Sequence, residues 1–385
     1  MVTLYDVARH AGVSIATVSR VLHGQQPVRD STRARVRAAI EELGYVPDGA
    51  AQSLARSRKD VIGLVGVEHN GLKPPEYDIE SMSLLFYDEV MRGVEACIRE
   101  RSWSLMITFL REDENLGITM PEDEPVQSRL LALAGKVDGL LIGEGVVPAA
   151  TVARLARRMP VVVVAGDTSQ RGADVVSADN WSGAHALVEH LVTGHGRRRL
   201  YLVDGPATAP DAKARRLAMQ AVIDAHPGSA LTGSFNGRFT VRNGQEAAEL
   251  LLATTREAPS GALPDAIICA NDQMAIGLLR TLTAGGVRVP ADVAVVGFDD
   301  IFPASLTHPP LTTVHQPMRE IGERACERLF ERIADPALRP KVELLPTELV
   351  LRESCGCPPG TVTRQLIGPA RPISGRRRNT PDCHG

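Results

Sequence analysis

The sequence lacks any apolar run long enough to cross a membrane. No segment approaches the ~20 consecutive apolar residues that a spanning helix needs. The first residues also lack the apolar stretch of a secretory signal, because Asp6, Arg9 and His10 interrupt it. We therefore expect a cytoplasmic protein without a membrane partner.

The sequence also lacks the common signatures of catalysis and nucleotide binding. Gly143-Glu-Gly145 is followed by Val-Val-Pro, so the third glycine of a dinucleotide-binding fingerprint is missing. Ala134-Gly-Lys-Val137 lacks the first glycine and the Ser/Thr of a phosphate-binding loop. Neither a G-x-S-x-G nor an H-E-x-x-H motif occurs. We predict no catalytic residue and no cofactor, and therefore not an enzyme.

Cysteines are few and scattered, six in 385 residues, which is typical of reduced thiols in a reducing compartment. The pair Cys355-Gly-Cys357 stands alone, whereas a structural zinc site is built from two such pairs. His185, His190 and His195 are five residues apart, a spacing that does not align them on one face of an α-helix. We interpret these histidines as surface or capping residues and predict no metal site.

The net charge is small, at −3, which argues against a general binder of polyanions. The charge is uneven, however. Residues 1–58 hold eight Arg against five Asp and Glu, a net of +3, and the remainder carries −6. A basic head on an acidic body fits a nucleic-acid contact that is confined to one end of the chain.

Residues 3–22 show the pattern of two short helices joined by a tight turn at Gly12. Thr3 and Asp6 resemble a capping box at the first helix. The apolar face of that helix recurs at helical spacing and consists of Leu4, Val7, Ala8 and Ala11. This layout is typical of the helix-turn-helix, whose second helix enters the major groove of DNA. A purely structural helical hairpin is the alternative.

The second helix, from Ile15 to about Leu22, presents a small and polar outer face. Ser14 is a natural N-cap for it. The outward residues are Ile15, Ala16, Thr17, Ser19 and Arg20. Small residues allow a close approach to base edges, and arginine is the commonest specific reader of guanine. We therefore expect this face, and Arg20 above all, to contact bases.

A third helix is expected from about Asp30 to Leu43, and Pro47 breaks the chain after it. Arg29 is a poor cap, so we expect Asp30 or Ser31 to cap this helix. Residues 48–58 have mixed helix propensity and should be mostly unfolded alone in water, because helix nucleation is costly. We interpret them as a linker that becomes helical when it packs on another surface.

From Asp60 onward, apolar strands alternate with amphipathic helices. The expected buried strands are residues 61–67, 104–109, 137–142, 160–165, 200–203, 266–269 and 293–296. This alternation indicates parallel sheets covered by helices. The pattern restarts at Trp181, which predicts two α/β halves with a small-molecule cleft between them. Residues 71–85 are an expected loop insertion beside that cleft.

Seven separate motifs, in the order found in the family, resemble the lactose/galactose-repressor (LacI/GalR) family of bacterial transcription regulators. The resemblance covers roughly residues 3–357. The motifs are Thr3-Leu-Tyr-Asp-Val-Ala through Thr17-Val-Ser-Arg-Val-Leu22; Glu42-Leu-Gly-Tyr-Val-Pro47; Ala51-Gln-Ser-Leu-Ala55; Asp179-Asn180 with Gly183 and Gly194-His-Gly-Arg-Arg198; Ala270-Asn-Asp-Gln-Met-Ala-Ile-Gly277; Val296-Gly-Phe-Asp-Asp300; and Pro309-Pro-Leu-Thr-Thr-Val314 with Gln316-Pro317.

The resemblance implies an N-terminal all-α helix-turn-helix headpiece and an α/β core with the fold of periplasmic binding proteins, made of two parallel-sheet subdomains. The expected divisions are headpiece 1–47, hinge helix 48–58, core 59–358 and tail 359–385. Within the core, the N-subdomain takes about 60–165 and 298–318, and the C-subdomain about 166–297 and 319–358. The implied crossovers fall near Gly166, Phe298 and Met318. The Pro-, Gly- and Arg-rich tail reads as disordered.

The resemblance also implies a transcriptional repressor that associates with the nucleoid and acts as a homodimer on double-stranded, pseudo-palindromic operator DNA. The family's reading residues map onto Ile15, Ala16 and Arg20, beside phosphate contacts from Ser14, Thr17 and Ser19. Its hinge helix maps onto Asp48 to Arg56, where Ala51 lies on the DNA and Leu54 wedges into the minor groove. Asp48 departs from the usual Asn and adds repulsion near phosphate.

The family's effector pocket maps onto Phe86, Tyr87, Arg216, Phe239 and Asp272. Aromatic rings would stack on a sugar or base, while the arginine and aspartate would donate to and accept from hydroxyls. The family pattern Arg-x-x-Gly-Phe reads Arg216-Leu-Ala-Met-Gln220 here, so the sequence departs from the family at its last two positions. No arginine lies six residues before Arg216, as in the purine-binding branch, so a carbohydrate effector is favoured. The alternative role of Asp272 is a helix N-cap.

An exported binding protein is the rival interpretation, because it shares the core fold. The basic headpiece counts against it. The effector's identity, the direction of its effect and the choice between dimer and tetramer stay open.

Overall fold

The computed structural model describes residues 2–22, 27–46, 58–68, 85–111, 124–166, 172–257 and 263–368. The chain divides into two compact units, Met1–Asp60 and Val61–Gly385. The predicted hinge, with Ala51 and Leu54, and most of the predicted insertion 71–85 lie outside the described residues. We call the first unit the headpiece and the second the core.

The headpiece consists of three helices, α1 (Leu4–Ala11), α2 (Ile15–Leu22) and α3 (Asp30–Leu43). The capping box is confirmed, since the Thr3 amide donates to Asp6 Oδ2 at 2.9 Å and the Asp6 amide donates to Thr3 Oγ1 at 3.4 Å. Gly12 ends α1 with a left-handed φ of 61°, a conformation that glycine adopts without steric cost. The turn therefore follows directly from local sequence rules.

The three helices enclose a small apolar core that contains Val7, Val18 and Val36, all fully buried. The expected cap of α3 is wrong. Arg29 occupies the N-cap position and makes no side-chain capping bond, while Asp30 is already the first helical residue. An acidic residue in the first turn still interacts favourably with the helix dipole, which offsets part of the missing cap.

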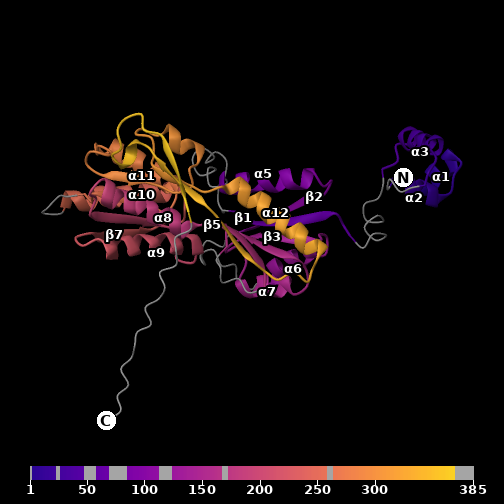
Figure 1. Cartoon of the computed structure of the whole chain (residues 1–385), viewed down its shortest axis with the longest axis horizontal. Coiled ribbons are helices and arrows are strands. Elements are labelled where there is room, and N and C mark those ends of the chain that lie inside the picture. The colour runs from indigo at the N-terminus through magenta and orange to yellow at the C-terminus, as the bar shows by residue number, and fades with distance from the viewer. Residues whose placement is uncertain are drawn as a thin grey trace, which may run out of the picture. The chain divides into compact units, whose positions relative to one another are not determined.

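The first lobe of the core is built on a six-stranded parallel sheet with the order β11-β5-β4-β3-β1-β2. Its strands are β1 (Val61–Glu68), β2 (Ser104–Arg111), β3 (Gly139–Gly143), β4 (Val161–Val164), β5 (Asp174–Ala178) and β11 (Val342–Leu345). Its helices are α5 (Leu85–Arg99), α6 (Glu124–Ala134), α7 (Ala149–Ala156) and α12 (Met318–Ala334). Helix α12 packs on α5 and on β3 to β5 (Figure 1).

The second lobe is built on a four-stranded parallel sheet with the order β7-β6-β8-β9, and it carries a three-stranded antiparallel sheet, β10-β12-β13. The strands are β6 (Arg199–Asp204), β7 (Ala230–Asn236), β8 (Ala266–Cys269), β9 (Ala294–Val296), β10 (Thr313–His315), β12 (Thr347–Leu351) and β13 (Thr363–Ile367). The helices are α8 (Asn180–Glu189), α9 (Pro210–Ala225), α10 (Val241–Glu257) and α11 (Asp272–Ala284), with a π-helical turn at His190–Gly194 and short 3₁₀ turns at Phe302–Leu306 and Glu353–Cys355.

The predicted class of the core is confirmed, but the predicted division into subdomains is not. The chain passes between the lobes after β5 at Asp179, between β10 and α12 at Pro317, and between β11 and β12 at Pro346. The expected crossovers near Gly166 and Phe298 are therefore wrong, and that near Met318 is right. Residues 298–318 stay with the second lobe because β10 pairs with β12, and most of 319–345 returns to the first because α12 packs there.

The predicted disordered tail is also corrected in part. Strand β13 pairs antiparallel with β12, with Thr347 opposite Ile367 and Leu351 opposite Thr363. Residues 363–367 therefore add an edge strand where the sequence predicted disorder from 359, because backbone pairing to β12 outweighs a weak local pattern. Among the described residues, no helix is long and apolar enough to cross a membrane.

Candidate functional site

The predicted DNA-facing helix α2 presents some, but not all, of its predicted residues to solvent. Ser14, Ala16 and Arg20 are exposed, whereas Thr17 and Ser19 are half-buried. The Thr17 amide donates to Ser14 Oγ at 3.2 Å, so Ser14 caps the helix as predicted. Ile15 packs against the apolar core of the headpiece, which differs from the expectation of a fully outward side chain.

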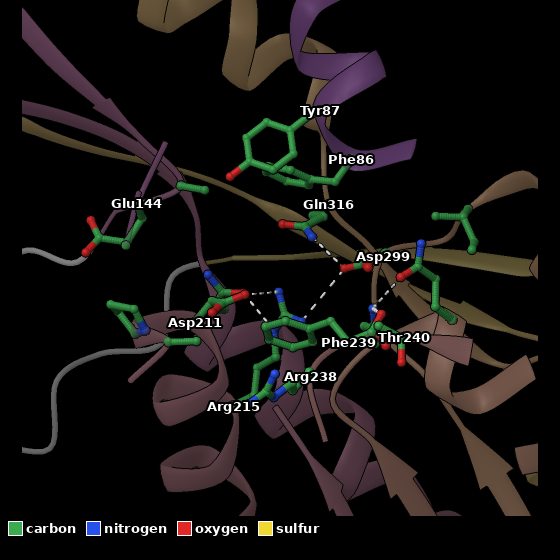
Figure 2. Close-up of a pocket in the computed structure, with 18 residues that line it drawn as sticks. Phe86, Tyr87, Glu144, Asp211, Arg215, Arg238, Phe239, Thr240, Asp299 and Gln316 are labelled. Carbon is green, nitrogen blue, oxygen red and sulfur yellow. Dashed lines mark hydrogen bonds and ion pairs between the residues drawn. The ribbon is translucent and has the colours of Figure 1, made fainter. Parts of the chain in front are cut away.

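The core encloses a cavity of about 150 Å³ between its two lobes (Figure 2). Its wall comes from segments that follow the strands of both parallel sheets, so the cavity lies at their carboxyl ends, where open α/β sheets bind ligands. The lining residues are Phe86, Tyr87, Glu144, Gly145, Ala165, Asn180, Ala209, Pro210, Asp211, Arg215, Arg238, Phe239, Thr240, Asn271, Gln273, Asp299, Ile301 and Gln316.

Three aromatic rings give the cavity apolar surface. Phe86 and Tyr87 meet edge to face, with centroids 5.4 Å apart. Figure 2 shows them, from the start of α5, across the cavity from Phe239. Burial raises the pKa of Tyr87 to about 12, so its hydroxyl is neutral at physiological pH and can both donate and accept. The three aromatic residues that the sequence predicted for an effector pocket thus line one cavity.

Two arginines line the cavity, the exposed Arg238 and the buried Arg215, whose side chain is only 7% exposed. Its Nε donates to Asn180 Oδ1 at 2.9 Å, and another guanidinium nitrogen donates to the Ala270 carbonyl. Carboxylate oxygens of Asp211 and Asp299 lie 3.4 Å and 3.8 Å from the guanidinium. The group is therefore held in one orientation by four segments of the second lobe, as a donor fork for a ligand must be.

The predicted arginine was one residue off. Arg216 does not line the cavity; it pairs with Asp204 and is about one-third exposed. The signal that identifies Arg215 is helical periodicity, since it shares a buried face of α9 with Ala218, Met219 and Val222. The pattern Arg-x-x-small-large then reads Arg215 to Met219, one position earlier than the sequence comparison placed it.

Asp272 lies beneath the cavity and does not line it. It is fully buried and accepts from Thr313 Oγ1 at 2.6 Å and from the Ile301 amide at 3.0 Å. The alternative role is also wrong, because the N-cap of α11 is Asn271, whose side chain accepts from the Met274 amide. Asp272 therefore fixes the segment after β9 against α11 rather than contacting a ligand.

The polar residues that sequence reasoning missed are Glu144, Asn180, Asp211, Asn271, Gln273, Asp299 and Gln316. Each follows a strand of one of the core's sheets, directly or within a few residues. Five of them belong to motifs that already marked the family resemblance: Asn180, Asn271, Gln273, Asp299 and Gln316. Their position after strands was a signal that could have placed them at the cavity.

The pKa of Asp299 is raised to about 7, mainly because the carboxyl is buried, while Arg215 and Gln316 oppose the shift. A raised pKa means that the folded state holds this proton more tightly than the unfolded chain, so stability is lost as pH rises through about 7. We predict that the thermal midpoint of the core falls between about pH 5 and pH 7, below the folded-state pKa and above that of the unfolded chain, and that Asp299→Asn makes the fall shallower. Tryptophan fluorescence during heating measures both; parallel profiles for wild type and variant contradict the assignment.

Two family descriptions match the chain. Residues 3–48 match "Bacterial regulatory proteins, lacI family", and residues 188–355 match "Periplasmic binding protein-like domain". The first range covers the three helices of the headpiece, and the second covers most of the second lobe together with α12 and β11 of the first lobe.

Curated relatives match over nearly their whole length. The ribose operon repressor of Escherichia coli (strain K12) is 33% identical over 349 residues, which cover 88% of this chain and 95% of that protein. The transcriptional repressor PurR of Mannheimia succiniciproducens is 31% identical over 359 residues, 92% of this chain and 98% of that protein. Catabolite control protein A of Priestia megaterium is 30% identical over 356 residues, covering 92% and 99%.

Solved structures also match the chain over most of its length. The Lac repressor dimer bound to operator and the anti-inducer ONPF superposes with a TM-score of 0.77 at 27% identity, covering 92% of this chain and 99% of that one. The complex of the transcriptional regulator CelR with cellobiose superposes with a TM-score of 0.63 at 29% identity, covering 92% and 100%.

Proposed function

Because the chain belongs to the lacI family of bacterial regulatory proteins and is a transcriptional repressor of that family, we propose that it binds a pseudo-palindromic operator as a homodimer and that a monosaccharide-sized effector in the core cavity controls this binding. The single observation that carries the effector proposal is the aromatic cavity with its fixed Arg215.

The headpiece supports the DNA part of the proposal. Helix α2 presents Ala16 and Arg20 to solvent beside the capping hydroxyl of Ser14, and no hydrogen bond or ion pair is recorded for the Arg20 side chain within the described residues. An arginine that is not already paired can form the bidentate contact to guanine O6 and N7. Ser14, Thr17 and Ser19 supply hydroxyls for phosphate oxygens.

Ala51 and Leu54 belong to the same proposal on sequence grounds. Residues 48–58 order on cognate DNA, and Leu54 from each of two chains wedges into the minor groove at the operator centre. A helix of low intrinsic stability between the headpiece and the core forms only on a partner surface. The effector can therefore control DNA binding by controlling whether this helix forms.

The cavity favours a small, neutral, polyhydroxylated effector. Its volume of about 150 Å³ is smaller than the roughly 300–1,000 Å³ typical of drug-sized ligands, which favours one sugar ring over two. Aromatic rings cover the apolar face of such a ring, while Arg215 donates to hydroxyls and Asp211 and Asp299 accept from them. Carboxylates around the cavity disfavour an anionic ligand, because like charges repel in a buried site.

A gel-shift titration on the DNA upstream of the protein's own gene tests the proposal. We expect salt-dependent binding by a dimer, lost when residues 1–58 are deleted, and a change of about 5- to 150-fold in affinity when one monosaccharide of a panel is added. Nucleobases form the second arm of the panel. DNA binding that survives deletion of 1–58 contradicts the headpiece, and a response to nucleobases alone contradicts the sugar.

Replacing Arg20 with alanine should weaken operator binding by about 5- to 150-fold and binding to random DNA far less, because a bidentate base contact contributes roughly 1–3 kcal/mol of discrimination. Competition gel shifts with both DNAs measure the two affinities. Arg37→Ala, an exposed arginine of α3, is the matched control and should leave the ratio of the two affinities unchanged. An equal loss on both DNAs for Arg20→Ala would make it a phosphate contact only.

A further inference from the structure

Two histidines and two cysteines meet at the end of helix α8, away from the residues that line the effector cavity. His190 and His195 come from the π-helical turn that follows α8, and Cys355 and Cys357 come from the segment after β12. One potential ligand atom from each of the four side chains lies within 4.8 Å of all the others. Within the described residues, no other group of this kind is found.

Four of the distances between these atoms are close to those between the ligands of a tetrahedral metal site. His190 Nε2 lies 3.6 Å from Cys355 Sγ and 3.7 Å from Cys357 Sγ, and His195 Nε2 lies 3.5 Å from Cys357 Sγ. The two Nε2 atoms are 3.1 Å apart. Ligands of a tetrahedral zinc with ordinary bond lengths are separated by about 3.6 Å for sulfur and nitrogen and about 3.3 Å for two nitrogens.

The backbone explains why residues five apart come together. In an α-helix the spacing of His190 and His195 would separate their side chains, but a π-helix has an i to i+5 repeat, which places one above the other. Gly356 has a left-handed φ of 113°, which turns both flanking thiols toward the histidines. Both devices are local irregularities, and such irregularities gather at functional sites.

The surroundings of the four side chains suit a metal ion. Cys355 is buried, and the other three side chains are half-buried. Both cysteines are free thiols. The Thr312 hydroxyl lies 3.2 Å from Cys355 Sγ, in position to donate to a thiolate, as groups behind metal ligands do.

We propose that His190, His195, Cys355 and Cys357 bind one zinc ion in a closed Cys₂His₂ site. Two thiolates and two imidazoles in a tetrahedron select zinc over magnesium or calcium, which prefer oxygen ligands. Binding displaces the two thiol protons to solvent, so the ion's charge of two is neutralised within the site. All four positions are filled by protein, which makes the site structural and leaves none open for catalysis.

The ion would join two segments that are far apart in the sequence. One is the end of α8, which begins immediately after the first crossover; the other follows β12, just after the third. The three-stranded sheet continues from the cysteine pair into β13. Zinc would therefore hold this C-terminal sheet on the second lobe. Strand β13 itself contributes few apolar contacts, because most of its described residues are exposed.

Metal content of the untagged full chain, purified under reducing conditions after growth with zinc, tests the proposal. We expect close to one zinc per chain by mass spectrometry of the metal. Replacing the zinc with cobalt should give the visible bands of tetrahedral cobalt and a thiolate-to-cobalt charge-transfer band. Less than a tenth of an equivalent in folded protein incubated with zinc overturns the proposal, as does a cobalt spectrum without the thiolate band.

Substitutions distinguish zinc binding at these four residues from adventitious zinc binding elsewhere on the chain. The double variant Cys357→Ser with His195→Gln should lose at least nine-tenths of the metal while its circular dichroism is retained. His185→Gln, on the same helix and stacked on Trp181, and Cys97→Ala, a buried cysteine of α5, should keep one equivalent. If the double variant is insoluble, the cobalt spectrum of the wild type decides. Metal retained by the soluble double variant overturns the proposal, and so does a Cys355–Cys357 disulfide found by mass spectrometry in freshly lysed cells.

Discussion

Replacing Arg215 with alanine should lower effector affinity by about 30- to 5,000-fold, because truncating a buried, hydrogen-bonded charge costs roughly 2–5 kcal/mol. Operator affinity without effector should stay nearly unchanged, since Arg215 lies in the core and not in the headpiece. Titration calorimetry with the sugar found in the gel-shift panel measures the first quantity, and the gel shift itself measures the second. In the proposed mechanism the variant remains bound to operator at effector concentrations that shift the wild type.

The neighbouring arginine provides the control. Arg215→Lys keeps the charge but loses the planar fork that reaches Asn180 and Ala270, so it should still be strongly impaired. Arg216→Lys keeps a cation beside Asp204, outside the cavity, and should bind effector like wild type. If the two lysine variants exchange these behaviours, the arginine assigned by sequence comparison is the functional one and the geometry of the cavity has been misread.

The headpiece was predictable from the sequence because local rules determine it. The capping box of Thr3 and Asp6, the left-handed Gly12 and the apolar face of α1 each act within four residues. The exception, Ile15, is instructive. Its position on a helical wheel points outward, but three short helices leave a core so small that a neighbouring partly exposed isoleucine packs against its edge.

The class of the core was predictable, but its division was not. Alternating strands and helices indicate parallel sheets whatever the strand order. The order itself depends on contacts between distant segments: β5 pairs with β4 and also with β11, which lies more than 160 residues later. Nothing in the short segment Val342–Leu345 distinguishes a strand of the first lobe from one of the second.

The cavity was half predictable for a similar reason. Aromatic residues and an arginine were expected from a family pattern, and one misaligned position exchanged Arg216 for Arg215. The missed polar residues required knowledge of which strand ends face each other. The histidine–cysteine cluster shows the limit most clearly, because α-helical spacing argued against His190 and His195 being neighbours, and a single π-helical turn reverses that conclusion.

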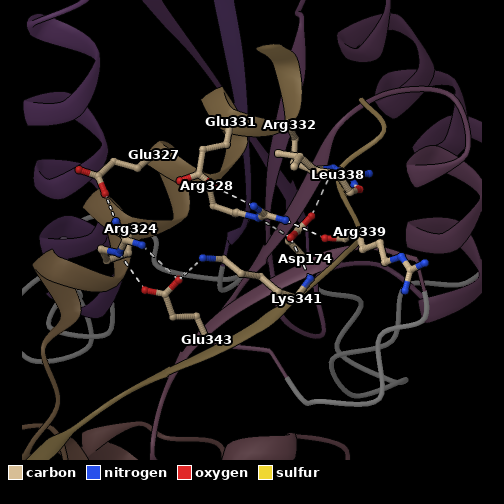
Figure 3. A network of polar contacts seen from close by, with 10 residues as sticks. All are labelled: Asp174, Arg324, Glu327, Arg328, Glu331, Arg332, Leu338, Arg339, Lys341 and Glu343. Carbon is tan, nitrogen blue, oxygen red and sulfur yellow. Dashed lines mark hydrogen bonds and ion pairs between the residues drawn. The ribbon is translucent and has the colours of Figure 1, made fainter. Parts of the chain in front are cut away.

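The stability of the first lobe depends on a buried charge at its least predictable junction. Asp174, at the start of β5, is fully buried and accepts from Arg328 Nε at 2.5 Å and from the Lys341 amide at 3.0 Å (Figure 3). Arg332 Nε lies 3.4 Å from its other oxygen. One carboxylate thus joins β5, the last element before the chain enters the second lobe, to α12 and the segment leading into β11, which follow the chain's return to the first lobe.

Asp174→Asn should lower the free energy of unfolding of the core by about 3–5 kcal/mol, because it preserves volume but leaves Arg332 buried without a counter-charge and leaves Arg328 with only the half-exposed Glu331. Urea unfolding followed by tryptophan fluorescence measures it, since Trp103 packs edge to face on Phe330 of α12 at 4.8 Å. Glu95→Gln, which breaks an exposed ion pair with Arg99 in the same lobe, should cost only about 0.3–0.5 kcal/mol.

A second substitution tests whether unpaired charge, rather than crowding or a cavity, causes the lower stability of Asp174→Asn. If uncompensated positive charge destabilises Asp174→Asn, then adding Arg332→Met should restore part of the stability, because it removes the buried cation that the first change left without a counter-charge. A double variant that is less stable than the sum of its single changes would point instead to packing around α12. Recovery of stability in the double variant would show that the buried ion pairs of Asp174 hold α12 on the first lobe.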